Sequence, residues 1–126
     1  MAFIKYHKTM NAHVPLVSIM PNGKIIFHKP SVEKYKIHSF QYGILFYDPP
    51  HKRLGIQLTN DEKETGVYKL FHSDALSSII NGRFFDYFSI RPQQTQTYAV
   101  RYNKVINMLI VPLKTTYKGK GNRPLS

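Results

Sequence analysis

The sequence of 126 residues has no cysteine and no tryptophan. The lack of cysteine excludes disulfide bonds and thiolate metal sites, and it fits an expected cytoplasmic location. Long apolar runs are lacking too: the longest stretches, such as Met108–Leu113, are far too short to span a bilayer. Residues Met1–His13 contain no continuous apolar segment of the kind that a secretory signal requires.

Acidic residues are scarce, and this imbalance is the first functional indication. Lys and Arg number 18 against 7 Asp and Glu, which gives a formal net charge of +11. Such an excess raises the local concentration of polyanions and makes their binding salt-dependent. It favours a nucleic-acid partner, DNA rather than RNA. An acidic protein or membrane surface is one alternative, and a charge that only keeps the chain in solution is another.

The common signatures of enzymes are also missing. The sequence contains no GxGxxG, GxxxxGK[ST], HExxH or GxSxG motif. The acids Asp61, Glu62 and Glu64 cluster, but they lie in the polar join Thr59–Thr65, which is predicted to be a solvated loop. The six histidines lack the HxH or HxxxH spacing that is typical of a metal site. We therefore expect no enzyme, no catalytic residue, no metal and no cofactor.

The residues that are present predict one strand-rich α+β domain over residues 1–126. Hydrophobic residues make up 42%, and the seventeen aromatic residues favour strands because flat side chains pack well on a pleated surface. Residues 14–58 and 67–113 repeat one order of elements. We expect two ββαββ units about a pseudo-twofold axis, with about eight short strands, two short helices and a shared core.

Turn residues and apolar patterns place the elements of both units. In the first unit the expected strands are Val14–Met20, Lys24–Phe27, Tyr42–Asp48 and Arg53–Leu58, and the helix is Pro30–Ile37. In the second unit they are Val67–His72, Leu76–Ile80, Thr97–Tyr102 and Met108–Leu113, with a helix at Gly82–Ile90. The first helix begins either with Pro30 in its first turn or with Ser31 as its cap.

The two units align without gaps inside each element. The helices are 53 residues apart and the closing hairpins 55 residues apart, so Leu54 and Ile56 correspond to Leu109 and Val111. All four side chains are expected to be buried, because they alternate in phase with the repeat. Tyr47 and Tyr102 also correspond, and we interpret them as packing residues rather than platforms for stacked bases.

Basic residues dominate the first unit and form the candidate nucleic-acid site. They are Lys24, Lys29, Lys34, Lys36, Lys52 and Arg53. Only Glu33 and Asp48 oppose them, and the start of a helix adds a weak preference for anions. Residues 114–126 are predicted to be a basic, flexible tail. An arm that grips a phosphate backbone is the functional alternative for this tail.

Gly23–Ile37, with the sequence GKIIFHKPSVEKYKI, resembles the core motif of the AbrB-like swapped-hairpin DNA-binding domains. The matching positions are Gly23, Lys24, Ile25, Phe27, Lys29 and Ile37. His28 replaces the proline of that motif, and Val32 stands where the family often has a DNA-contacting arginine. Two such units in one chain resemble the MraZ arrangement. The resemblance implies that the basic residues of the first hairpin and helix face DNA, in a small transcriptional regulator or an antitoxin-like protein.

A second resemblance competes with the first. From Tyr42 onward, four expected strands precede the helix at Gly82–Ile90, which is the order in the PC4 and Whirly-like single-strand binders. This analogy implies binding of single-stranded DNA or RNA. A protein-interaction or accessory domain without any nucleic-acid role is the third alternative. The sequence also leaves open a homodimer.

Overall fold

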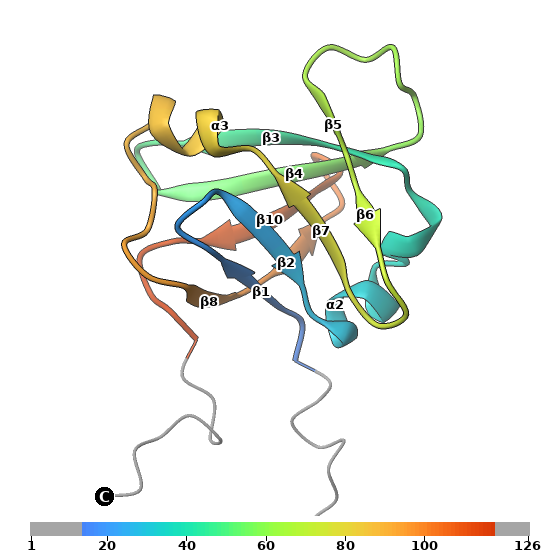
Figure 1. Ribbon diagram of the computed structural model, residues 1–126, viewed down its shortest axis with the longest axis horizontal. Coiled ribbons are helices and arrows are strands. Elements are labelled where there is room, and N and C mark those ends of the chain that lie inside the picture. Colours follow the sequence, from blue (N-terminus) through green and yellow to red (C-terminus); the bar gives the residue numbers. More distant parts are fainter. Residues whose placement is uncertain (1–13, 118–126) are drawn as a thin grey trace, which may run out of the picture.

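The computed structural model describes residues 14–117, and the α+β, strand-rich class is confirmed (Figure 1). The strands are Leu16–Ile19 (β1), Lys24–Phe27 (β2), Tyr42–Asp48 (β3), Arg53–Thr59 (β4), Val67–Lys69 (β5), Phe71–His72 (β6), Ser77–Ile80 (β7), Gln96–Ala99 (β8), Arg101–Asn103 (β9) and Met108–Pro112 (β10). The helices are Lys29–Lys34 (α2) and Gly82–Tyr87 (α3), with a 3₁₀ turn at Ile37–Ser39 (η1).

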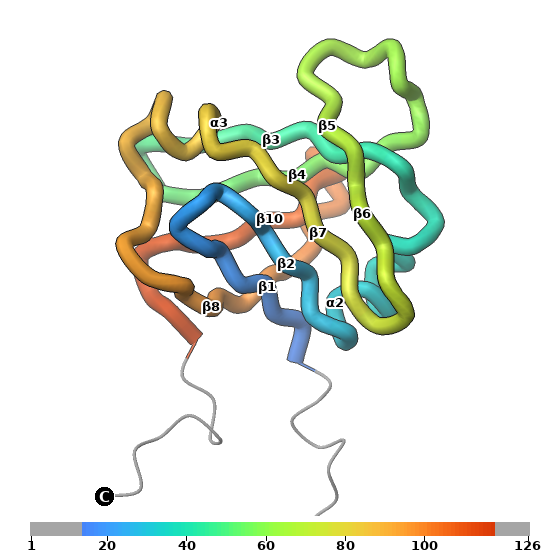
Figure 2. The backbone as a smooth tube through the Cα atoms, in the orientation of Figure 1, coloured from blue at the N-terminus to red at the C-terminus, as the bar shows by residue number. Residues whose placement is uncertain are grey.

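Two five-stranded antiparallel sheets form the body of the molecule. The order is β6-β7-β2-β1-β8 in the first sheet and β5-β3-β4-β10-β9 in the second. Only Leu70 separates β5 from β6, and only Val100 separates β8 from β9, so each pair is one bent strand that runs from one sheet into the other. The bend between β5 and β6 is visible in Figure 2. The sheets are thus joined at both edges, and the pairings close a ring of eight strands.

The core lies inside this ring, where alternate side chains of the strands point inward. Leu54, Ile56, Leu109 and Val111 are all buried, as the repeat pattern predicts. The two bend residues, Leu70 and Val100, are buried as well. The other core side chains are Val17, Ile19, Ile25, Phe27, Val32, Ile37, Ile79, Phe85 and Tyr98.

The strand registers agree with the predicted repeat. In the β4–β10 ladder Leu54 pairs with Val111 and Ile56 with Leu109. Because Leu54 corresponds to Leu109 and Ile56 to Val111 with an offset of 55, exchanging the two units converts one pair into the other, as a twofold axis through the ladder requires. In the β2–β7 ladder Lys24 pairs with Ile80 and Phe27 with Ser77. The same relation holds here with an offset of 53, since Lys24 corresponds to Ser77 and Phe27 to Ile80.

The left-handed backbone positions follow the same two offsets. Four non-glycine residues have positive φ. Lys36 and Ser89 are 53 residues apart, and Lys52 and Asn107 are 55 residues apart. Both units therefore turn the chain at corresponding places, after the helix and within the closing hairpin.

Both helices are shorter than the sequence pattern predicts. Pro30 lies in the first turn of α2, whereas Ser31 does not cap it: its Oγ donates a 2.7 Å hydrogen bond to the carbonyl of Leu16. The left-handed Lys36 and Ser89 (φ 52° and 55°) follow α2 and α3, and an L-residue in that conformation cannot continue a right-handed helix.

Within residues 14–117, no helix is long and apolar enough to cross a membrane.

Candidate nucleic-acid interface

The six basic residues of the predicted site lie in separate places. Lys24 begins β2 and lines a small hollow with Phe71 and Leu76, while Lys29 follows the other end of that strand. Lys34 ends α2, and Lys36 comes two residues later. Lys52 and Arg53 form the end of the β3–β4 turn. The fold brings Lys34 and Lys36 to one hollow, and it does not bring the six residues to one surface site.

Arg53 is already engaged within the protein. Its Nε and Nη2 donate to the same Asp48 oxygen, at 3.1 and 2.7 Å, and His51 Nδ1 lies 2.9 Å from that oxygen. The hydrogen bond from Arg53 is the main reason that the pKa of Asp48 is lowered, and His51 adds to it. Lys29 makes a looser, exposed ion pair with Glu33 at 3.9 Å. Arg53 is therefore the less available of the two for a ligand.

The excess positive charge is divided between the described residues and the two ends of the chain. Residues 14–117 contain thirteen basic and all seven acidic residues, a formal charge of +6. The other five basic residues include Lys118, Lys120 and Arg123 of the predicted tail, which lie outside the described residues. The tail begins beside β8, where the Tyr117 amide donates to the Thr97 carbonyl at 2.7 Å.

The first hollow, of about 300 Å³, lies where α2 meets the end of β4. It is lined by Lys34, Tyr35, Lys36, Phe40, Ile56, Leu58, Tyr102, Asn107 and Leu109. Lys34, Lys36 and Lys104, which lies on the adjoining β9–β10 turn, make no ion pair within residues 14–117. The first hollow thus combines an apolar lining with cations that are free to meet an anion.

A pair of aromatic rings stands in the first hollow. The ring centroids of Tyr35 and Tyr102 are 6.4 Å apart and the planes are tilted by 41°, and Lys34 Nζ lies 5.9 Å from the Tyr35 centroid. The Tyr35 hydroxyl donates to the carbonyl of Val100 at 3.3 Å, and the Tyr102 hydroxyl donates to Asn107 Oδ1 at 2.7 Å. Tyr102 is 47% exposed, which differs from the packing role expected for it, and its ring is available to a planar ligand.

The second hollow, of about 560 Å³, lies at the opposite end of β4. Its lining includes Tyr47, Lys52, Phe88, Ser89, Gln93 and Gln96. The rings of Tyr47 and Phe88 are 5.1 Å apart, and this contact agrees with the interpretation of Tyr47 as a packing residue. Along β4 the nearest lining residues of the two hollows, Lys52 and Ile56, are four residues apart, or about 13 Å at a strand rise of about 3.3 Å per residue.

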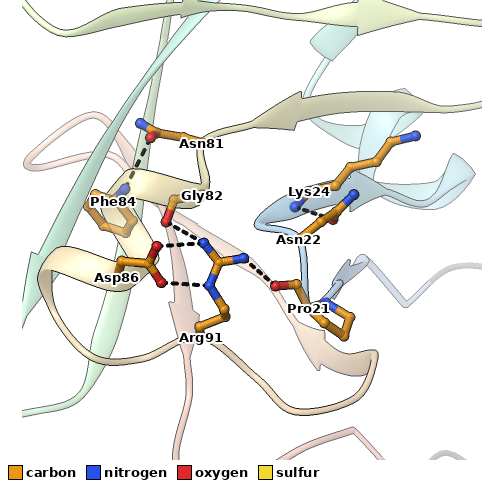
Figure 3. Close-up of polar contacts among 8 residues, drawn as sticks. All are labelled: Pro21, Asn22, Lys24, Asn81, Gly82, Phe84, Asp86 and Arg91. Carbon is orange, nitrogen blue, oxygen red and sulfur yellow. Dashed lines mark hydrogen bonds and ion pairs between the residues drawn. The ribbon is translucent and has the colours of Figure 1, made fainter.

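Arg91 fixes α3 against the β1–β2 turn (Figure 3). It donates to both oxygens of Asp86, at 2.6 and 2.8 Å, and to the carbonyls of Gly82 and Pro21. Its hydrogen bonds to Asp86 lower the pKa of that carboxyl group. Asn81 caps α3 by accepting a 3.1 Å hydrogen bond from the amide of Phe84. Arg91 therefore holds α3 in place rather than serving as a free cation.

A polar chain lies on the outer side of β1. Ser18 Oγ is 2.7 Å from His28 Nε2 and 2.9 Å from Thr97 Oγ1. Burial lowers the pKa of His28 below its ordinary value of 6.5, because the charged ring loses hydration. No acidic side chain hydrogen-bonds to this chain within the described residues, so a Ser–His–acid triad is not formed there.

Sequence reasoning did not identify the aromatic surface beside α3. A third hollow, of about 520 Å³, is lined there by residues that include Phe46, Tyr68, Arg83, Phe84 and Tyr87. Tyr87 is 81% exposed. The signal in the sequence is the spacing of Phe84, Tyr87 and Phe88, which are three and four residues apart and so share a helix face.

Comparisons with known proteins assign no family to the chain. No family model matches it, and no curated protein or solved structure matches it significantly. In the part of the chain that the structure describes, no group of three His, Asp or Glu side chains could hold a metal ion.

Proposed function

We propose that this protein binds nucleic acid, and that the first hollow holds a nucleotide of a single-stranded segment. The observation that carries the proposal is the position of Lys34 and Lys36 beside the exposed ring of Tyr102. Bases stack on aromatic rings whatever their sequence, and lysines attract the neighbouring phosphates. A base in a duplex is already stacked and paired, so a ring in a hollow favours a single strand.

The electrostatics of the first hollow support this proposal. Lys34, Lys36 and Lys104 are free of ion pairs among residues 14–117, and Glu33, on the same helix, is paired with Lys29. A volume of about 300 Å³ lies at the lower end of the range for small-ligand pockets. One nucleotide, rather than a folded domain, is the kind of ligand that fits it.

For the cellular role we propose, from the AbrB resemblance, a DNA-binding regulator or an antitoxin-like protein. We also propose a cytoplasmic location and a homodimer. The AbrB resemblance implies that DNA contacts Lys24 and Lys29, which lie at opposite ends of β2. A preference for duplex DNA would favour those residues over the first hollow.

A binding panel tests the proposed function. We would measure fluorescence anisotropy at low salt with a twelve-nucleotide DNA strand, the matching RNA strand and the twelve-base-pair duplex. AMP and inorganic phosphate would be competitors. We expect the single strands to bind more tightly than the duplex, and AMP to compete better than phosphate. If none of these ligands binds, a protein-interaction domain becomes the better description.

A further inference from the structure

The two hollows correspond to one another under the offsets of the predicted repeat. Tyr35 and Lys36 of the first hollow lie 53 residues before Phe88 and Ser89 of the second. Tyr102, Asn107 and Leu58 correspond with an offset of 55 to Tyr47, Lys52 and Leu113. Each hollow therefore has one pair of aromatic rings, one left-handed residue after a helix and one left-handed residue in a hairpin turn.

The chemistry of the two hollows differs where the ligand would be contacted. The lysine pair of the first hollow, Lys34 and Lys36, corresponds to Tyr87 and Ser89, which carry no charge. The second hollow instead has the amides of Gln93 and Gln96, together with Lys52. Neither amide group makes a hydrogen bond to another residue of the described chain, so both keep their donors and acceptors for a ligand.

We propose that the second hollow is a second nucleotide subsite, in which Gln93 and Gln96 recognise the edge of a base. This inference rests on the proposed nucleic-acid binding. Glutamine amides form paired hydrogen bonds with adenine, whereas lysine contacts to phosphate carry no sequence information. The first hollow then supplies affinity for any sequence, and the second hollow supplies a preference for adenine.

The separation of the hollows sets the length of strand that fills both. The distance of about 13 Å along β4 corresponds to roughly four nucleotides at the stacked rise of about 3.4 Å per nucleotide. A twelve-nucleotide strand is long enough to reach both hollows, whereas a mononucleotide fills only one. Joining two subsites through one ligand raises its affinity without any new contact.

The test compares the variant Gln93→Ala/Gln96→Ala with the control variant Gln94→Ala/Gln57→Ala. The control removes two amides that do not line the second hollow. Binding of dA, dT and dC twelve-mers would be measured for the full chain, after thermal melts show that each variant folds. We expect the wild type and the control to prefer dA, and the test variant to lose roughly 5-fold or more of that preference at an unchanged salt slope. Gln93 is exposed, so the single variant Gln93→Ala remains available if the double variant does not fold.

A second measurement maps the contacts directly. Ultraviolet crosslinking of a dA twelve-mer, followed by mass spectrometry, should label peptides from both hollows, including Lys52 or Tyr98, which line the second hollow and not the third. Crosslinks confined to Tyr35 and Tyr102 would overturn the second subsite, as would an unchanged adenine preference in the test variant. Both results would leave the proposed function intact. Absence of binding by the wild type to every strand would instead remove the proposed function itself.

Discussion

Gly23 and Gly82 approach so closely that a β-carbon on Gly23 would lie 2.5 Å from the Gly82 Cα. The contact joins the β1–β2 turn to the start of α3, where the Asn81 amide also donates to the Gly23 carbonyl at 3.1 Å. Gly23 has φ of +85°, a conformation that side chains with a β-carbon rarely adopt. The backbone contact at Gly23 and the Arg91 side chain, which donates to the carbonyls of Pro21 and Gly82, together hold the turn against the helix.

The variant Gly23→Ala is expected to lose stability for two reasons, the positive φ and the contact with Gly82. Gly66→Ala is the matched control, because Gly66 has the same φ of +85° while a β-carbon there would meet Ile44 Cγ2 at an ordinary 3.5 Å. We expect Gly23→Ala to lower the free energy of unfolding by more than about 1 kcal/mol, and by more than the control does. Urea unfolding measures both values. Equal losses would show that the close approach contributes nothing.

His28 should make stability depend on pH. Its pKa is lowered in the folded protein, so the unfolded chain binds the proton more tightly and protonation favours unfolding. The free energy of unfolding should therefore fall as the pH drops below about 6.5, and level off below the folded pKa. We expect His28→Gln to remove this component. Thermal melts of wild type and variant between pH 8 and pH 4.5 measure it, and parallel curves would contradict the assignment.

Tyr102 should contribute a stacking surface to nucleic-acid binding. Base–aromatic stacking is worth about 1–3 kcal/mol per base by alanine substitution, so Tyr102→Ala should weaken single-strand binding by roughly 5-fold or more. Tyr102→Phe keeps the ring and removes only the hydrogen bond to Asn107. We expect near-normal affinity for the phenylalanine variant in anisotropy titrations. If both variants bind as the wild type does, stacking on Tyr102 is excluded.

Local signals in the sequence predict most of the element positions. The strands Lys24–Phe27 and Tyr42–Asp48 have the predicted bounds, because Asn22-Gly23 and Pro49-Pro50 mark where each chain reversal occurs. The bends at Leu70 and Val100 were not predicted. An apolar residue continues the strand pattern through each bend, and the transfer to another sheet depends on partners that are distant in the sequence.

The candidate site was predictable only in part, for a similar reason. The sequence shows which residues are basic, but the fold decides which of them lie near one another. Lys34 and Lys36 share a hollow, whereas Lys52 lies at the other end of β4. Arg53 is held by Asp48, which lies five residues away on the paired strand. Tyr47 and Tyr102 occupy corresponding positions but differ in surroundings, since Phe88 packs against Tyr47 while Tyr102 faces Tyr35.

The most direct test of nucleic-acid binding at the first hollow is a salt titration of two charge-matched variants. Lys34→Ala/Lys36→Ala removes two lysines from the hollow, and Lys63→Ala/Lys69→Ala removes two lysines that do not line it. On a twelve-nucleotide strand we expect the first variant to bind more weakly than the second, with the slope of log K against log salt reduced by about 1.4 in magnitude, because each phosphate contact on a single strand contributes about 0.7. Equal affinities and equal slopes for the two variants would contradict a defined site and indicate diffuse attraction by the whole basic surface.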